Sequence, residues 1–404
     1  MFFSSQGQIM FRQISVSAPS KVILHGEHAV VYGKSAIAAS LDLRTRMYLT
    51  PIPDEKQQVL EVDFPDVHVH QSWKVSEVQK YLLQHKPGWV SKYNAEICDT
   101  YLKLVKDFIQ KSSITHGKVV HQDLQLASLT CFFYLFSVIC DADHIVPLKI
   151  RVESDIPIGA GLGSSAALSV CLAAGLHAIQ SGKTLLDPAD QDNICQLALL
   201  SEKILHGKPS GIDNAISTYG GFIRFQQGCV EPIEFNPAVN LQILLVNSCV
   251  SRQTKDMVAK VKDQYDKYPS AISPLLESIH GISESFLQTL KEMGNEEEGE
   301  MAEDKYTTLN DLIRYNQSIL KALQVSHPTL ENILNVAEEH GLVGKLTGAG
   351  GGGFAFILLP PGVTEKTVEE VKEKLHKKSF VCYEAELGVN GVHIQIDNSD
   401  CISQ

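Results

Sequence analysis

Three glycines alternate with larger residues in the segment Pro157–Ala167, at positions Gly159, Gly161 and Gly163. Glycine has no Cβ, so the backbone N–H groups of such a turn can close on a ligand and point toward it. Ser164 and Ser165 follow where a helix is expected to begin, at the positive end of its dipole. The pattern predicts an anion cradle, and phosphate is the expected anion. The alternative is a tight strand-to-helix turn capped by Ser164.

The elements on either side of this cradle have clear periodicities. In Leu148–Ser154, apolar residues alternate with polar ones, which is typical of a half-buried strand. The segment Ala166–Ile179 is rich in alanine and leucine and predicts a packed helix. The cradle is therefore expected at a strand–turn–helix junction.

A lysine precedes an apolar run near the start of the chain. A short strand is expected at Ile14–Ala18, and Lys21 leads into a second apolar run, Val22–Leu24. Burying a lysine beside such a run demands a counter-charge. The polar residues that follow, taken singly, could be hydrogen-bonded edge residues: His25, Glu27 and His28. Neither His25-x-x-His28 nor His68-x-His70 predicts a metal site, because no second Cys/His cluster accompanies them.

A carboxylate lies at an unfavourable place in the helix predicted for Ile194–Leu205, which is expected to stop at Gly207. Glu202 falls in the last turn, where the helix dipole disfavours a negative charge. This placement suggests that a cation compensates Glu202, and Lys203 could supply it. Beyond the turn at 209–211, Asp213 is either a helix N-cap or a carboxylate that faces the cradle opposite Lys21.

A second concentration of glycines spans Gly348–Gly353 and formally matches G-x-G-x-x-G. A strand, Phe354–Leu359, follows it, whereas a dinucleotide-binding fingerprint requires a helix there. The Rossmann interpretation is therefore excluded, and close packing of this backbone against a ligand is expected. The remaining expected elements are strands at 37–49 and 59–69 joined as a hairpin or meander, strands at 222–226, 241–247 and 392–396, helices at 75–85, 93–111, 126–140 and 363–378, and a helical region at 255–323 with an exposed acidic loop at 294–300.

Composition bounds the class of protein. A chain of 404 residues with 44% hydrophobic and 20% charged residues is expected to form two globular domains. The net charge of −12 argues against general binding to nucleic acid or to an anionic membrane. Nine cysteines are scattered without a C-x-x-C pair, and most of them are expected to be reduced core residues, as at Cys131 and Cys140. With no secretory signal at the N-terminus and no long apolar span, we expect a cytoplasmic protein.

Three segments, in this order, resemble the motifs of the GHMP kinase family: Lys21–Val31, Pro157–Ala167 and Lys345–Gly353. The first segment and Glu202–Asn214 resemble in particular the branch that phosphorylates mevalonate in animals. Galactokinases share the Gly-Glu-His core at 26–28 but usually continue with Thr-Asp-Tyr, which is absent here.

The resemblance implies an α+β, two-domain GHMP kinase fold with the active site in the cleft between the domains. Residues 1–239 would form a ribosomal-protein-S5-like domain that binds ATP and Mg²⁺, and residues 240–404 an α/β sandwich, with the last strand returning toward the cleft. The implied activity is ATP-dependent phosphorylation of (R)-mevalonate to 5-phosphomevalonate in isoprenoid and sterol precursor synthesis. A homodimer and feedback inhibition by prenyl diphosphates at the anion cradle are further implications, and peroxisomal partition is not settled by the resemblance.

The resemblance also assigns roles to residues. Asp213 takes the catalytic carboxylate position and Lys21 the lysine beside it, while Ser165 and Glu202 match Mg²⁺ ligands. The residues that match nucleotide contacts, besides Lys21, are Ser154, Gly159, Ala160, Gly161, Leu162, Gly163, Ser164 and Ser165. Those assigned to the neighbourhood of the substrate are Glu27, His28, Ser210, Thr254, Gly348 and Ala349. Ser20 departs from the family, which usually has glycine there, so its β-carbon could crowd the loop or narrow the substrate pocket.

The chemistry fits phosphoryl transfer, which depends mainly on alignment and charge neutralisation. One carboxylate and one hydroxyl suffice for Mg²⁺ beside phosphate and water. Asp213 could accept the substrate hydroxyl's proton or only orient it, and Lys21 could hold Asp213 ionised or stabilise the transferring phosphoryl group. Two other functions remain open: another small-molecule kinase of this family, or a catalytically silent sensor that binds nucleotide and metabolite.

Overall fold

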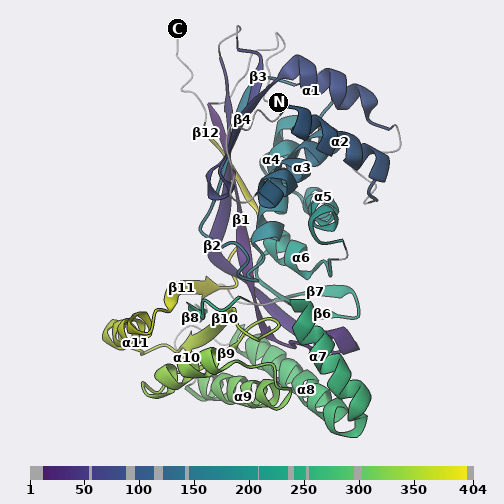
Figure 1. The fold of residues 1–404 in the computed structure, drawn as a ribbon. Coiled ribbons are helices and arrows are strands. Elements are labelled where there is room, and N and C mark those ends of the chain that lie inside the picture. Colours follow the sequence, from purple (N-terminus) through teal and green to yellow (C-terminus); the bar gives the residue numbers. More distant parts are fainter. Residues whose placement is uncertain are drawn as a thin grey trace.

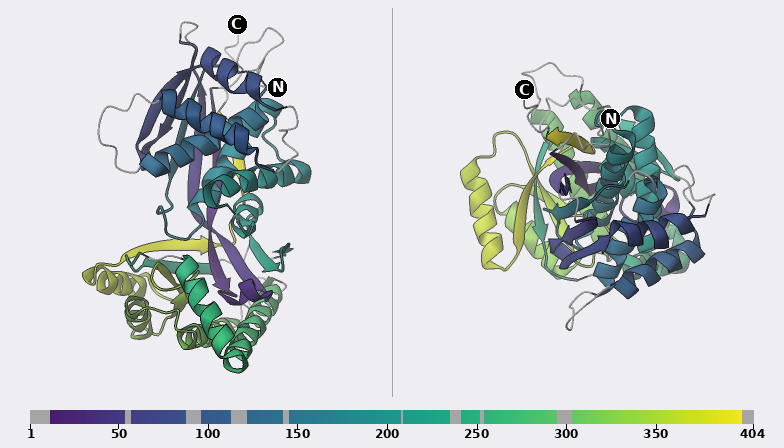
Figure 2. Two further views of the ribbon diagram at one scale, coloured as in Figure 1. Left: turned by 45° about the vertical axis from the view of Figure 1, so that its right-hand side comes forward. Right: turned by 90° about the horizontal axis from the view of Figure 1, so that it is seen from above.

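The computed structural model describes residues 12–53, 57–87, 96–112, 122–141, 145–207, 209–234, 241–251, 254–294 and 303–397. They form an elongated molecule of two parts, with long strands running from the upper part into the lower one (Figure 1). The upper part packs helices on one side of a sheet, and the lower part is a smaller sheet covered by helices (Figure 2).

One continuous sheet of twelve strands links the two parts. The order β4-β3-β5-β2-β11-β8-β10-β9 forms its main path, β1 pairs with β2 and β12, and β6 pairs with β2 and β7. The strands are β1 (Gln13–His25), β2 (Ala36–Pro51), β3 (Val59–Phe64), β4 (Val69–Lys74), β5 (Leu148–Ser154), β6 (Phe222–Gln226), β7 (Cys229–Ile233), β8 (Leu241–Asn247), β9 (Val343–Leu346), β10 (Phe354–Leu359), β11 (Val381–Leu387) and β12 (His393–Asp397).

The strands predicted at 148–154, 222–226, 241–247 and 354–359 are confirmed, but three other predictions are wrong. The two short runs before residue 25 form one strand, β1, because a register shift after Pro19 lets the pairing with β2 continue. The expected hairpin of β2 and β3 does not form, since β5 lies between them, antiparallel to β2 and parallel to β3. The run 59–69 is also broken after Phe64 by a 3₁₀ turn at Pro65–Val67, and β4 begins there.

Helices cover the sheet in two groups. Those of the upper part are α1 (Val75–Tyr81), α2 (Asp99–Ser112), α3 (Gln122–Ile139), α4 (Ser164–Ser181), α5 (Pro188–His206) and α6 (Ile212–Tyr219). Those of the lower part are α7 (Thr254–Lys267), α8 (Pro269–Gly294), α9 (Glu303–Ala322), α10 (Pro328–Glu338) and α11 (Glu365–Lys377). Short 3₁₀ helices occupy Ala29–Tyr32 and Leu83–His85. The helices predicted at 126–140 and 363–378 and the helical region at 255–323 are confirmed, whereas the one predicted at 75–85 ends at Tyr81 and the one predicted at 93–111 begins only at Asp99. Most of the acidic run at 294–300 falls outside the described residues.

The apolar helix α3 is a core helix of the upper part. Among the described residues it alone is long and apolar enough to cross a membrane, and 67% of it is buried inside the protein. Every residue from Ser128 to Ile139 is buried, where Phe132 and Phe133 pack edge to face. Cys131 and Cys140 are buried and free, as expected. This burial agrees with the prediction of a packed helix.

A small hydrophobic cluster fixes α6 against the end of β1. It includes Ile23 from β1, Ile212 and Ile216 from α6, and Ile223 from β6. The Ser217 hydroxyl of α6 donates a hydrogen bond to the Pro19 carbonyl of β1 over 2.8 Å. The helix that carries Asp213 is therefore packed directly on the strand that carries Lys21.

The chain returns to the upper part at its end. β11 pairs with β8 along its whole length and meets β2 at Leu387 opposite Leu41. β12 then pairs antiparallel with β1, from Gln13 opposite Asp397 to Ser17 opposite His393. The boundary at 239–240 stays a prediction, because the sheet is continuous across the two parts.

Candidate active site

Lys21 and Asp213 meet beside the glycine loop, although they are far apart in the sequence. Lys21 is 8% exposed, and its Nζ lies 3.1 Å from Asp213 Oδ1. The need for a counter-charge, inferred from the apolar run after Lys21, is thus met by Asp213. The alternative role of Asp213 as a helix cap is wrong, because the N-cap of α6 is Gly211.

The glycine loop packs directly on this pair. The Lys21 N–H donates to the Leu162 carbonyl over 2.9 Å, which ties the loop to β1. Gly163 has φ +78°, and a Cβ there would come within 3.0 Å of Lys21 Cγ and 3.9 Å of Asp213 Oδ2. Glycine at this position therefore lets the backbone reach αL and leaves room for the lysine side chain. The loop is built around the ion pair.

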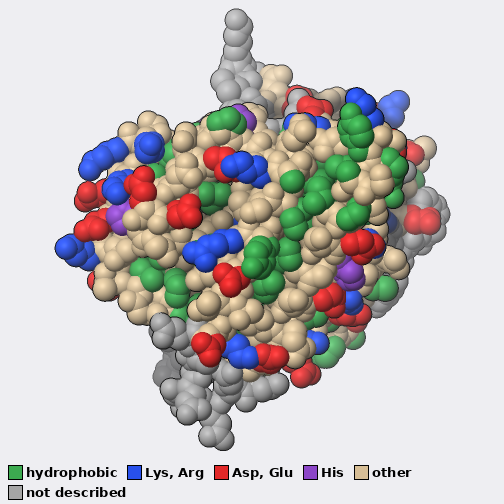
Figure 3. Space-filling view, turned by 90° about the horizontal axis from the view of Figure 1, so that it is seen from below, with side chains coloured by type: hydrophobic (Ala, Val, Ile, Leu, Met, Phe, Trp, Pro, Cys, Tyr) green, Lys and Arg blue, Asp and Glu red, His purple; other side chains and the backbone are tan. Residues whose placement is uncertain are grey.

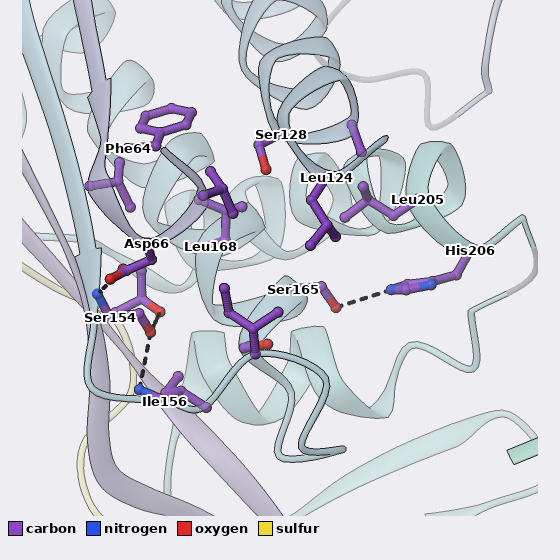
Figure 4. Close-up of a pocket in the computed structure, with 16 residues that line it drawn as sticks. Phe64, Asp66, Leu124, Ser128, Ser154, Ile156, Ser165, Leu168, Leu205 and His206 are labelled. Atoms are coloured by element: carbon purple, nitrogen blue, oxygen red, sulfur yellow. Dashed lines mark hydrogen bonds between the residues drawn. The ribbon is translucent and has the colours of Figure 1, made fainter. Parts of the chain in front are cut away.

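The two serines after the loop open α4. Gly163 is the N-cap, so the alternative in which Ser164 caps the helix is wrong. Ser165 lies in the first turn, with its hydroxyl 3.1 Å from His206 Nε2 at the end of α5 (Figure 4). Because 18 residues of α4 stand behind this turn, its free N–H groups and dipole favour an anion in front of the serines.

Glu202 is a buried carboxylate between α4 and α5. It is 3% exposed, with Oε1 3.5 Å from Ser169 Oγ and Oε2 3.8 Å from His206 Nε2. Burial raises the pKa of Glu202 to about 7, and the negative charge of Asp213 adds to this, while hydrogen bonds from Ser165 and Ser169 and the charge of Lys21 oppose it. A cation beside Glu202 would favour its ionised form.

An open pocket with a cavity volume of about 160 Å³ lies beside the glycine loop and the start of α4 (Figure 4). Its lining is mostly apolar and includes Phe64, Leu124, Ile156, Ile158, Leu168 and Leu205. Polar groups stand at one side: Ser154 Oγ accepts from the Ile156 N–H over 3.2 Å, and Asp66 Oδ2 accepts from the Ser154 N–H over 2.8 Å. The pocket combines an apolar wall with the anion cradle, as a nucleotide requires.

The first and third glycine-containing segments meet across the two parts of the molecule. His28 Nε2 lies 2.9 Å from the Ala349 carbonyl oxygen, and the Thr347 hydroxyl donates to the Ile23 carbonyl over 2.8 Å. Glu27 is 3% exposed and forms an ion pair with Lys345. His28, Gly348 and Ala349 are therefore near one another, as the resemblance predicts, whereas the Glu27 carboxylate is turned into the protein.

Three glycines of the third segment pack on the protein's own chain. A Cβ on Gly350 would lie 2.1 Å from the Val325 carbonyl oxygen, and one on Gly352 would lie 2.6 Å from that of Val250. A Cβ on Gly351 would meet Met257 Sδ at 2.7 Å. The expectation of close packing against a ligand is wrong for these three positions, since neighbouring protein atoms account for them.

Two predicted substrate residues are not brought into this group. Ser210 is exposed, and its hydroxyl accepts from the Ile212 N–H over 3.4 Å. Thr254 is exposed and is the first residue of α7. The hydrogen bonds and ion pairs of the described residues link neither of them to Lys21 or Asp213.

Sequence reasoning missed three residues that support the site: His206, Asn316 and Lys345. Asn316 is fully buried and donates from Nδ2 to His25 Nδ1 and Glu27 Oε2, over 3.0 and 3.2 Å. A signal was present, because Asn316 continues the helical spacing of buried Leu309, Ile313 and Leu320. Likewise, Lys345 interrupts an apolar strand immediately before the glycines.

The chain matches two family models. The GHMP kinases N terminal domain covers residues 131–221 and the GHMP kinases C terminal domain covers residues 299–381. Among curated proteins, it is 40% identical to mevalonate kinase of Mus musculus over 93% of this chain and 94% of the mouse protein. It is 40% identical to that of Homo sapiens over 94% of each, and 32% identical to that of Arabidopsis thaliana over 95% of this chain and 99% of the plant protein.

Solved structures agree in fold. Mevalonate kinase of Methanococcus jannaschii superposes with a TM-score of 0.64 at 22% identity, over 92% of this chain and 98% of the other. A structure of L. major mevalonate kinase in complex with R-mevalonate gives 0.61 at 21% identity, over 93% and 96%. The two matched family models give the class, that of the GHMP kinases, and the fold agrees with it. Within that class, the full-length relatives show that the chain belongs to the mevalonate kinase family.

We predict that Glu202→Gln stabilises the protein at pH 8 and has little effect at pH 4. Glu202 has a pKa of about 7 in the folded protein and an ordinary value of 4.5. The folded state therefore binds more protons, and this residue's contribution to stability is present below pH 4.5 and lost as the pH rises through 7. Glutamine mimics the protonated form, so the gain at pH 8 should be roughly 2 kcal/mol. Denaturant unfolding with a chelator present measures it, and an equal gain at both pH values would contradict the prediction.

We predict that Ser20→Ala raises the free energy of unfolding by about 1 kcal/mol. Ser20 is fully buried, and its Oγ has no hydrogen-bond partner among the described residues. Replacing the hydroxyl with hydrogen removes the free-energy cost of burying a polar group that no hydrogen bond compensates. The matched control is Ser217→Ala, which deletes a buried hydroxyl that donates to Pro19 and should destabilise by about the same amount. Equal losses in both variants would show that Ser20 has a partner.

Proposed function

We propose that the protein transfers the terminal phosphoryl group of ATP to the 5-hydroxyl of (R)-mevalonate, giving 5-phosphomevalonate and ADP. The observation that carries this proposal is the Lys21–Asp213 pair against the glycine loop, in a chain that belongs to the mevalonate kinase family. The product would enter isoprenoid and sterol precursor synthesis.

The ion pair supplies the groups that the reacting atoms need. The hydroxyl oxygen of mevalonate forms a bond to the γ-phosphorus as the bond from that phosphorus to the β–γ bridging oxygen breaks. Asp213 lies where it can orient the hydroxyl and accept its proton, and Lys21 keeps a positive charge beside both the carboxylate and the loop. In a loose transition state the charge on the transferring group matters more than the base, so we assign Lys21 to its stabilisation.

The nucleotide is assigned to the pocket beside the loop. Its apolar wall suits a purine ring, with Leu124 and Ile158 at partly exposed positions where a ring could stack. The phosphates would then lie against the residues Gly159–Ser165 and the N-terminus of α4. Ser154 belongs to the pocket lining and would contact the nucleoside.

We propose that Ser165 and Glu202 hold Mg²⁺. No cluster of three or more His, Cys, Asp or Glu side chains suited to a metal occurs in the described part of the chain, and Mg²⁺ bound with phosphate needs only one or two protein oxygens. The residues fit, because Glu202 is a buried carboxylate in hydrogen-bond contact with Ser165 and lacks a full counter-charge. When bound there, the ion would neutralise phosphate charge.

The alternative of a silent sensor is disfavoured by the intact catalytic pair, since a sensor has no need of it. The alternative of another small-molecule kinase is tested by a coupled ADP-release assay with mevalonate, galactose, homoserine and phosphomevalonate as separate acceptors. We expect turnover with mevalonate alone. Absence of mevalonate-dependent ADP release would overturn the proposal.

We further propose feedback inhibition by prenyl diphosphates, whose diphosphate would occupy the same anion cradle as ATP. Apolar lining next to the cradle would accept the prenyl chain. Inhibition should then be competitive against ATP. An inhibitor pattern in which raising ATP does not restore the rate would contradict it.

A cytoplasmic homodimer is the proposed state in the cell. Figure 3 shows basic and acidic side chains interspersed on the lower face of the molecule, with a band of hydrophobic side chains beside them. Tyr268 and Tyr315 of the lower part are 53% and 61% exposed, and such apolar surface supports self-association. Light scattering of the purified protein tests the dimer, and imaging of the tagged protein tests its location.

We predict that Asp213→Ala lowers kcat with mevalonate by about 10³-fold while ATP binding persists, because the loop and pocket remain. Asp213→Asn keeps the shape but cannot accept a proton. A loss as large as that of alanine would assign the proton to Asp213, and a much smaller loss would assign orientation. Asp266→Ala, which removes an exposed partner of Lys262, is the control and should leave kcat unchanged. Steady-state kinetics and equilibrium nucleotide binding measure these effects.

A further inference from the structure

Four buried polar side chains from three segments form one cluster between the two parts of the molecule: His25, Glu27, Asn316 and Lys345. Asn316 bridges His25 Nδ1 and Glu27 Oε2. Lys345 donates to Glu27 Oε1 and, over 2.8 Å, to the Leu346 carbonyl. We call this set the interdomain cluster, since His25 and Glu27 belong to the end of β1 and its following turn, and Asn316 and Lys345 to α9 and β9.

The ion pair in this cluster is out of contact with solvent. The side chains of Lys345 and Glu27 are 0% and 1% exposed. Burial raises the pKa of Glu27 and lowers the pKa of Lys345, and their mutual attraction opposes both shifts. Lys345 Nζ also lies 5.2 Å from the centre of the Phe356 ring. Either charge alone would be strongly unfavourable here, so each segment can occupy its place only when the other does.

The interdomain cluster is continuous with His28 and Ala349, two residues that the family resemblance assigns to the neighbourhood of the substrate, and we call their contact the substrate wall. Glu27 is followed by His28, and the chain after Lys345 leads through Thr347 to Ala349. Thr347 is bonded to the Ile23 carbonyl, and His28 to the Ala349 carbonyl. Two segments from opposite parts of the molecule are thus joined by three contacts: Ile23 with Thr347, Glu27 with Lys345, and His28 with Ala349. Of these three contacts, the one between Glu27 and Lys345 is a buried ion pair.

We propose that Lys345 is a positioning residue for mevalonate: through Glu27 it fixes His28 against Ala349 and so sets the shape of the substrate wall. Glu27 then acts from within the protein and does not contact the substrate, which revises the role that the family resemblance implies for it. The inference rests on the proposed function. Its test is separate from that of the proposed function, because it compares the KM for mevalonate among variants that are still active.

The experiment compares Lys345→Met, Glu27→Gln and the double variant. Each single variant leaves one buried group unpaired and should lower Tm. The double variant removes both charges and should recover most of that loss, because a buried pair replaced by neutral groups is close to neutral for stability. If Lys345 positions the wall, the KM for mevalonate should stay raised by about tenfold in the double variant, while the KM for ATP stays within about twofold of wild type.

If the double variant recovers both the wild-type Tm and the wild-type KM for mevalonate, the inference is overturned. The ion pair would then have a purely structural role. An equal rise in both KM values would also overturn it. Asn316→Ala, which removes only hydrogen bonds to the cluster, should raise the mevalonate KM by about threefold and keeps the test available if Lys345→Met does not fold. The control is Lys34→Met with Glu277→Gln, an exposed ion pair between the same two parts, which should change neither KM. Wild-type protein that lacks mevalonate-dependent turnover would instead refute the proposed function.

Discussion

The structure depends on the constraint that a lysine carried into the protein interior must find a carboxylate. Lys21 and Lys345 are both buried, and each meets its partner, Asp213 or Glu27, on a segment remote in the sequence. Hydrophobic packing alone would tolerate small shifts between these segments. The Lys345–Glu27 pair, which is closed off from solvent, tolerates them much less, because its attraction falls with distance and nothing nearby replaces it. The Lys21–Asp213 pair adds a weaker constraint of the same kind, because the Asp213 side chain is 34% exposed.

Strand β1 mechanically links the two pairs. It carries Lys21 near its end, and the turn after it carries Glu27. Its neighbour β2 extends the whole length of this pairing, and α6 is packed on it through Ile212 and Ile216. A displacement at the Glu27 end would thus be transmitted to the Lys21–Asp213 pair along a hydrogen-bonded strand. Under the proposed function, the reacting groups and the substrate wall would therefore be linked through one hydrogen-bonded strand.

The sequence pattern predicted those parts of the site that are formed by residues close together in the chain. The strand 148–154, the glycine turn and the helix after it follow from alternation, glycine spacing and helix propensity, and all three are confirmed. Strand order was not predictable, because β5 enters between β2 and β3 from far along the chain. The partner of Glu27 was missed for a similar reason: a buried charge at residue 27 requires a counter-charge, but the sequence does not say that it comes from residue 345. The prediction for glycines 350–352 was wrong because close packing against protein atoms and close packing against a ligand both require a residue without a Cβ.

The buried charges of the interdomain cluster are fully paired, whereas the buried carboxylate of Glu202 is not. Lys345 and Glu27 neutralise each other inside the interdomain cluster, with Asn316 and the Leu346 carbonyl taking up further hydrogen bonds. Beside the Lys21–Asp213 pair, by contrast, the buried carboxylate of Glu202 lies 3.8 Å from the His206 ring, and its pKa is still raised to about 7 by burial and by the charge of Asp213. Holding Glu202 ionised at this place costs stability. Under the proposed function, the same imbalance would favour a cation that arrives with the phosphates, so that what costs stability would supply affinity and charge neutralisation for phosphoryl transfer.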